Sequence, residues 1–171
     1  MVSLHVRRNL RIGVMGAGSC DTDTARLARE VGREIGRTGA ILICGGRGGV
    51  MEECARGAKE AGGLTVGILP GSNPEDANDW IDLPIATDLG NARNVINVLT
   101  SDVIIAIRGG SGTLSEIALA LKVGTPVIGL ETWELTPPPG QSIPSVCRVD
   151  TPASAVATAA RIARDRRTPD R

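Results

Sequence analysis

The sequence predicts an α/β fold in which a doubly wound, mostly parallel sheet carries helices on both faces. Short aliphatic runs alternate along the chain with longer stretches of helical periodicity. The runs are apolar throughout rather than at every second residue, which is typical of parallel strands that are buried on both faces. A chain of 171 residues fits one domain. We expect that domain to span residues 1–171, with its core at about residues 11–165 and with mobile termini.

Three strands and two helices are predicted in the first part of the chain. The strands are residues 12–17 (IGVMGA), 40–44 (AILIC) and 64–69 (LTVGIL). The first helix follows Asp21 and Asp23, carries an apolar stripe at Leu27, Val31 and Ile35, and ends near Gly39. The second helix follows Cys44 and ends near residues 62–63.

The remaining elements follow a polar loop at residues 72–82. We expect a short strand at 83–87, a helix at 91–100, a strand at 102–107, a helix at 111–123 and a strand at 125–130. Residues 131–145 contain a run of three prolines and are expected to form an irregular loop or a lid. Thr151 and Pro152 are a good N-cap and first residue for a last helix, and a charged tail covers residues 164–171.

Composition limits the class of function. Nineteen basic and nineteen acidic side chains give no net charge, and the chain has two Trp and no Phe or Tyr. Both features argue against nucleic acid as the partner, because such binding relies on positive charge and aromatic stacking. No apolar run is long enough to span a membrane and no signal peptide is recognisable, so we expect a cytoplasmic protein.

The cysteine and histidine content argues against a metal site. The four cysteines, Cys20, Cys44, Cys54 and Cys147, have no zinc-like spacing, and we expect them to be reduced. Cys44 and Cys54 lie in apolar or helical surroundings, where a thiol packs as a small hydrophobic group. The one histidine, His5, lies near the N-terminus. We therefore predict no metal ligands.

Two glycine-rich turns form a partial internal repeat. With an offset of 64 residues, GGRGGVME (45–52) aligns with GGSGTLSE (109–116), and both follow an aliphatic strand and open a helix. Such turns point backbone N–H groups at a ligand and are typical anion sites. Tight strand-to-helix turns also favour glycine for purely structural reasons. Because both turns lie where doubly wound sheets bind ligands, we favour the anion site.

Three arginines lie beside predicted helix starts. Arg47 is inside the first glycine turn, Arg108 precedes the second, and Arg93 is in the first turn of the helix at 91–100. A cation at a helix N-terminus opposes the helix dipole, unless an anion lies between them. Guanidinium groups suit phosphate in shape and charge, although each arginine can instead face solvent or pair with a nearby carboxylate.

These turns and arginines define the predicted phosphate-binding residues. They are Gly16, Gly18, Gly45, Gly46, Arg47, Gly48, Gly49, Arg93, Arg108, Gly109, Gly110, Ser111, Gly112 and Thr113. The turn at Gly16 and Gly18 is a fragment of the dinucleotide fingerprint, but it lacks the third glycine, and no acidic residue ends the following strand. NAD is therefore not the expected ligand.

Glu116 has two interpretations. Thr113 and Glu116 have the spacing of a capping box, in which the carboxylate returns to the N–H of the N-cap residue, and local sequence slightly favours that role. The alternative is catalysis, in which Glu116 stabilises positive charge at the anomeric carbon of a bound nucleotide while Arg93 holds its phosphate.

The segments around both glycine turns resemble a known family. GGRGGVMEECARGAKEAGGLTVGILPG and NARNVINVLTSDVIIAIRGGSGTLSEIALALKVGTPVIGL are similar to Rossmann-like proteins that include the molybdenum cofactor carriers of plants and algae. That group is related to the lonely-guy type phosphoribohydrolases, often labelled lysine decarboxylase-like, and distantly to DNA-processing protein A. The resemblance covers about residues 11–165.

The phosphoribohydrolases carry the motif P-G-G-x-G-T-x-x-E, preceded by an Arg-Lys pair. Gly109, Gly110, Gly112, Thr113 and Glu116 match the motif, and Arg93 matches the arginine. Two positions depart from the pattern, since Arg108 replaces the proline and Asn94 replaces the lysine. The departures are typical of the carrier-like branch, which is thought to hold a phosphate-bearing ligand without consuming it.

Two functions follow. The first is a carrier-like protein that binds a small phosphate-bearing ligand, either a nucleotide or the molybdenum cofactor; no cofactor is firmly implied. The alternative is a nucleoside 5'-monophosphate phosphoribohydrolase with Glu116 and Arg93 as catalytic residues. The resemblance also implies a homo-oligomer, either a dimer or a tetramer. Trp133 can stack on a ligand ring, although packing under the proline-rich loop is the commoner role.

Overall fold

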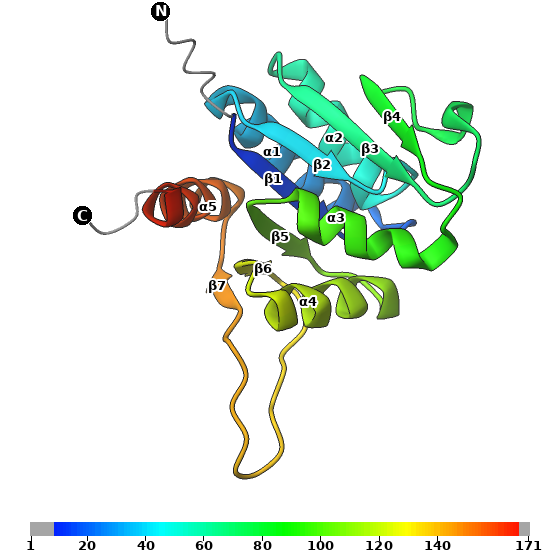
Figure 1. Cartoon of the computed structure of the whole chain (residues 1–171). Coiled ribbons are helices and arrows are strands. Elements are labelled where there is room, and N and C mark those ends of the chain that lie inside the picture. Colours follow the sequence, from blue (N-terminus) through cyan, green and yellow to red (C-terminus); the bar gives the residue numbers. More distant parts are fainter. Residues whose placement is uncertain (1–8, 168–171) are drawn as a thin grey trace, which may run out of the picture.

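In the computed structural model, which describes residues 9–167, seven parallel strands form one sheet in the order β4-β3-β2-β1-β5-β6-β7 (Figure 1). The strands are β1 Arg11–Met15, β2 Ile41–Cys44, β3 Leu64–Leu69, β4 Leu83–Ala86, β5 Val103–Ile107, β6 Val127–Leu130 and β7 Cys147–Val149. The chain builds outward from β1 to β4, returns to pair β5 with β1, and then builds outward in the other direction. Ligands of such sheets bind where the order reverses, beyond the carboxyl ends of the strands.

The helices cover both faces of this sheet, which confirms the predicted doubly wound fold. On one face lie α1 (Thr22–Thr38), α2 (Val50–Glu60) and α5 (Pro152–Arg167); on the other lie α3 (Asn94–Thr100) and α4 (Ser111–Val123). Consecutive residues of β5 alternate between the two cores: Ile105 packs with α1, α2 and α5, whereas Ile104 packs with α3 and α4. The strand is apolar throughout because both its faces are buried.

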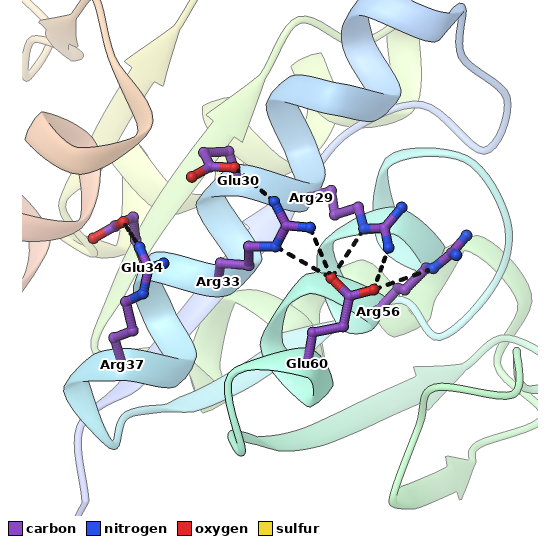
Figure 2. A network of polar contacts seen from close by, with 7 residues as sticks. All are labelled: Arg29, Glu30, Arg33, Glu34, Arg37, Arg56 and Glu60. Carbon is purple, nitrogen blue, oxygen red and sulfur yellow. Dashed lines mark hydrogen bonds and ion pairs between the residues drawn. The ribbon is translucent and has the colours of Figure 1, made fainter.

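Helices α1 and α2 pack with almost no side chain between them. A Cβ on Gly57 would overlap the backbone of Arg29 and lie 3.0 Å from Arg33 N, and one on Gly32 would overlap the backbone of Cys54. At the edge of this contact, the Glu60 carboxylate of α2 receives Arg29 and Arg33 of α1 and Arg56 of α2 (Figure 2). The pair is therefore held by backbone contact inside and by ion pairs at its edge.

Most predicted boundaries are confirmed. Asp21 caps α1 by accepting from Thr24 N at 2.7 Å, and Gly39 ends the helix in the left-handed conformation. Helix α5 begins at Pro152, after Thr151 accepts a bond from Ser154 N. The predicted helix at 91–100 instead begins as a 3₁₀ turn, η2 (Gly90–Arg93), which α3 continues. The polar loop contains a second 3₁₀ turn, η1 (Pro74–Asp76).

Strand β7 was not expected from the sequence. It has three residues at the sheet edge and pairs with β6, and its sequence, Cys-Arg-Val, has no aliphatic run. The irregular segment between β6 and β7 extends away from the body (Figure 1). His5 and the end of the charged tail lie outside the described residues. Within the described part, no helix is long and apolar enough to cross a membrane.

Candidate functional site

A cavity of about 350 Å³ lies at the carboxyl ends of β1, β2 and β5, where the strand order reverses. Its volume is in the range of small-molecule sites. The lining residues come from the turns after these strands, from η2 and α3, and from the start of α4: Val14, Met15, Gly16, Ala17, Gly18, Gly45, Met51, Asn91, Arg93, Asn94, Gly110, Ser111, Gly112, Thr113 and Glu116. The cavity therefore lies at the edge of the sheet where the sequence predicts a ligand site.

The N-terminus of α4 opens directly onto the cavity. Gly110 is the N-cap and has no side chain to cap the helix, and the first helical hydrogen bond runs from Leu114 N to Gly110 O at 3.0 Å. The N–H groups of Ser111, Gly112 and Thr113 precede that bond and lie at the positive end of a 13-residue helix. This end of the cavity is suited to an anion.

Two glycines of this turn have no local structural need for glycine. A Cβ on Gly110 or Gly112 would meet no described atom within 4 Å, and neither residue has a positive φ. Gly109 differs, because its φ is 99° and a Cβ there would overlap the Thr113 side chain. The space at the Cβ positions of Gly110 and Gly112 is open, and both residues line the cavity, so a ligand can approach the backbone closely there.

Arg93 also lines the cavity. Its side chain is half-buried, and Nη1 donates to the carbonyl of Ile68 on β3 at 2.5 Å. Burial lowers the pKa of this guanidinium, and the Glu116 carboxylate opposes that shift. Nε is buried without a hydrogen-bond partner among the described residues. The guanidinium is thus fixed on one side and has donor capacity left.

Glu116 lies at the floor of the cavity and does not cap the helix. Helix α4 begins at Ser111, so Thr113 is already its third residue, and the capping-box interpretation is wrong. The Glu116 side chain is buried and accepts a bond from Asn97 Nδ2 at 3.0 Å. Burial raises the pKa of the carboxyl, partly offset by Asn97 and by the charge of Arg93.

Two buried polar atoms on residues close to Glu116 in the fold or the sequence lack partners within the described chain. Asn97 Oδ1 and Thr113 Oγ1 are buried with no hydrogen-bond partner in the described part of the chain. Buried polar atoms are normally paired, and of these two residues Thr113 lines the cavity, so its hydroxyl marks a point where a ligand or water can bond. The floor can therefore recognise a polar group as well as an anion.

The first glycine turn is not the structural equivalent of the second. Helix α2 starts at Val50, six residues after β2 ends at Cys44, whereas α4 starts at Ser111, four residues after β5 ends at Ile107. Glu52 is accordingly the third residue of its helix and Glu116 the sixth of its own. Of the turn at 45–49, only Gly45 lines the cavity.

Packing explains most glycines of that first turn. Gly49 has a φ of 66°, and a Cβ there would lie 2.6 Å from the Gly18 carbonyl carbon. Gly46 has a φ of 72° and packs against Gly67 of β3. The turns after β1 and β2 are therefore held together backbone to backbone, as the bond from Val50 N to Ala17 O at 3.0 Å also shows. Arg47 is exposed and does not line the cavity.

Arg108 also lies outside the cavity. Its guanidinium donates to the Glu131 carboxylate at 2.7 and 2.9 Å and to Thr24 Oγ1 at 2.6 Å, and it pairs with Asp21. The Glu131 carboxylate raises the pKa of Arg108. This arginine thus connects the turn after β5 to the start of α1 and to the segment after β6. Trp133 lines a different pocket, formed by the segment between β6 and β7.

Comparison with known proteins shows the family of this chain. A family model, described as the SLOG cluster4 family, matches residues 9–157. The chain belongs to the SLOG cluster4 family.

Solved structures similar to this SLOG cluster4 chain include two proteins named for the molybdenum cofactor. The molybdenum cofactor binding protein of Rippkaea orientalis is 40% identical with a TM-score of 0.82, over 91% of this chain and 98% of that one. The Moco carrier protein of Chlamydomonas reinhardtii is 41% identical with a TM-score of 0.79, over 92% and 99%. Their likeness confirms the resemblance to the molybdenum cofactor carriers.

A curated relative is a cytokinin riboside 5'-monophosphate phosphoribohydrolase of Mycobacterium tuberculosis, 32% identical over 126 residues, which are 68% of this chain and 67% of that protein. DNA processing protein A of Helicobacter pylori shares the fold at 18% identity and a TM-score of 0.65. The SLOG cluster4 chain thus has relatives among carriers and among hydrolases.

Asn97 supports the cavity of this SLOG cluster4 chain from behind Glu116, and the sequence did not predict it. It lies on α3, is buried and holds the Glu116 carboxylate. A signal was present, because an asparagine within an apolar helical stretch needs a partner when it is buried. Its partner is 19 residues away in sequence, and only the packing of α3 against α4 brings the two together.

Proposed function

We propose that this protein binds a small phosphate-bearing ligand in the cavity between β1 and β5 and holds it without consuming it. The phosphate lies at the N-terminus of α4, in contact with the N–H groups of Ser111, Gly112 and Thr113. Arg93, which also lines the cavity, contributes positive charge. The rest of the ligand lies toward Asn91, Asn94 and the turn at Gly16 and Gly18.

The observation that carries the proposal is the open space before Gly110 and Gly112. Glycine early in a helix lowers its stability relative to alanine by up to about 1 kcal/mol. Neither glycine is required by φ or by a neighbouring atom within the described chain. Close approach of a ligand to the backbone supplies a reason for both, and the free N–H groups give that ligand its charge.

The molybdenum cofactor is the ligand we favour as cargo. The structural relatives named for it align over nearly their whole length. The cavity also offers what a phosphate-bearing heterocycle needs, namely a helix N-terminus for the phosphate and an unpaired hydroxyl on Thr113. A nucleotide has the same two parts as this ligand, a phosphate and a polar ring system. The shared chemistry that the cavity would recognise is therefore a phosphate attached to a polar ring system.

The decisive variant is Gly112→Ala. We expect it to fold as stably as the wild type, since no described atom contacts the added methyl group, and to lose ligand binding because the methyl group occupies the phosphate position. Mass spectrometry of the native protein identifies any ligand that co-purifies, and calorimetry measures binding of AMP or of the isolated cofactor. Unchanged affinity in Gly112→Ala would contradict the proposed phosphate position.

An enzymatic function is the second candidate, and Glu116 is the observation that favours it. A buried carboxylate at the floor of the cavity, near Arg93, has the setting of a group that assists cleavage of an N-glycosidic bond. Against it stands Asn94, which occupies the position of the lysine in the hydrolase motif.

Incubation with AMP separates the two candidates. A carrier releases no adenine, and its AMP binding weakens in Arg93→Ala. A phosphoribohydrolase releases adenine and ribose 5-phosphate, and Glu116→Gln abolishes the turnover. Turnover of that kind would replace the carrier function by the enzymatic one.

A further inference from the structure

Arg93 reaches the cavity by crossing the end of a strand. It is the last residue of η2, yet its Nη1 bonds to Ile68 O on β3, and the side chain passes the end of β2 on the way. The guanidinium is therefore anchored to a strand that is distant from the N-terminus of α4. Its position depends on what lies along that path.

Gly45 lies on that path. A Cβ built on Gly45 would overlap Nη1 of Arg93 and lie 2.7 Å from its Nη2 and 2.6 Å from Met51 Sδ. Gly45 has no positive φ, unlike Gly46 and Gly49, so its backbone does not require glycine. It is also buried, which leaves an added methyl group no direction in which to avoid the guanidinium.

We propose that Gly45 is a positioning residue, whose missing side chain provides the passage through which Arg93 reaches Ile68 O and faces the cavity. The inference rests on the proposed function for its effect on binding, although the passage itself is a property of the ligand-free protein. It replaces the role predicted from the glycine repeat: Gly45 acts on the ligand through Arg93 rather than by offering its own N–H group.

Gly45→Ala should displace the guanidinium and leave the fold intact, because the overlapped atoms are the ends of two flexible side chains. Displacement breaks the bond to Ile68 O and moves the positive charge away from the phosphate position. Loss of a hydrogen bond to a charged group corresponds to a weakening of AMP binding by about ten- to a hundredfold. Gly71→Ala is the matched control, since a Cβ there meets its nearest atom, Asp76 Oδ2, at an ordinary 3.5 Å.

The ligand-free test is a double-mutant cycle on the melting temperature. We expect Gly45→Ala to lower Tm by about 5 °C in the wild-type background and by much less in the Arg93→Ala background, where only the flexible end of Met51 still overlaps the added methyl group. If Gly45→Ala alone does not fold, a folded Gly45→Ala/Arg93→Ala double variant supports the inference in the same way. An equal loss of Tm in both backgrounds, or rescue by Met51→Ala and not by Arg93→Ala, would overturn the inference.

Calorimetry with AMP then separates this inference from the proposed function. Weaker binding in Gly45→Ala, with Gly71→Ala unchanged, supports both. Equal binding by wild type and Gly45→Ala overturns the positioning role. A wild-type protein that binds neither AMP nor the molybdenum cofactor defeats the proposed function, and the coupling of the two residues in Tm still decides the positioning role.

Discussion

The role of Glu116 depends on residues that surround it only in the folded protein. Three residues after Thr113, Glu116 has the spacing of a capping box. Helix α4 starts earlier than that pattern requires, at Ser111, and the Glu116 carboxylate instead lines the cavity and accepts a bond from Asn97. Burial makes the ionised form costly and raises the pKa of the carboxyl. Ionisation of Glu116 therefore affects the free energy of unfolding, and it also changes the charge that a ligand in the cavity meets.

Glu116→Gln should therefore change the pH dependence of stability. In the wild type, folding favours the protonated acid, so the stability due to Glu116 is complete below the pKa of an unfolded glutamate, about 4.3. It is lost as pH rises through the higher pKa of the folded state. Relative to the glutamine variant, the wild type should lose free energy of unfolding over that interval, as measured by urea unfolding from pH 4 to pH 8. A difference that is constant over the interval would refute the prediction.

At the scale of elements, the contact between α1 and α2 depends on glycines. Gly57→Ala places a methyl group against the backbone of Arg29, which cannot move without separating the helices. We expect a loss of about 3 kcal/mol in the free energy of unfolding. The same substitution at Gly112, where space is open, should stay within about 1 kcal/mol of wild type. Chemical denaturation of both variants checks this, and similar values for the two would contradict it.

The ion pairs at the edge of that contact give a second prediction at this scale. Hydrogen bonds from Arg29 and then Arg33 lower the pKa of Glu60 to about 2. The stability due to Glu60 is thus present above about pH 4.3 and lost as pH falls through the lower value. Glu60→Gln should destabilise the protein at pH 7, because Arg29, Arg33 and Arg56 then face one another without their carboxylate (Figure 2).

Glu34→Gln is the control for this network, since it removes a single pair with Arg37. Urea unfolding at pH 7 should give Glu60→Gln a lower free energy of unfolding than Glu34→Gln. Because 1 M salt screens ion pairs, it should reduce this difference between the two variants. A gap that persists unchanged at pH 2 would show that the ion pairs are not its cause.

At the scale of the whole molecule, the resemblance implies a homo-oligomer. Val95 and Leu99 lie one turn apart on α3 with 42% and 61% of their surface exposed. If copies associate through this face, Val95→Glu with Leu99→Glu should yield monomers that keep the wild-type circular dichroism spectrum. Light scattering after size exclusion measures the mass, and a wild-type monomer would refute the expected assembly.

The sequence by itself determined the fold class and pointed to the edge of the sheet at which the cavity lies. Unbroken aliphatic runs such as β5 specify parallel strands buried on both faces, and local signals such as Asp21, Gly39 and Pro152 specify helix ends. These are local properties, so the chain carries them without reference to distant residues. Strand β7 was not predicted, because its three residues have no aliphatic pattern and form a strand only through pairing with β6.

Only the tertiary structure decided which glycines and charges meet at the cavity. The two glycine turns look alike in sequence, yet one packs against the turn after β1 and the other leaves its N–H groups free. Arg93 and Arg108 look alike too, but Arg93 faces the cavity while Arg108 is held by Glu131. The reason is physical: a side chain's partners depend on residues that are remote in the chain, and only packing brings Asn97, Gly45 and Ile68 to their places.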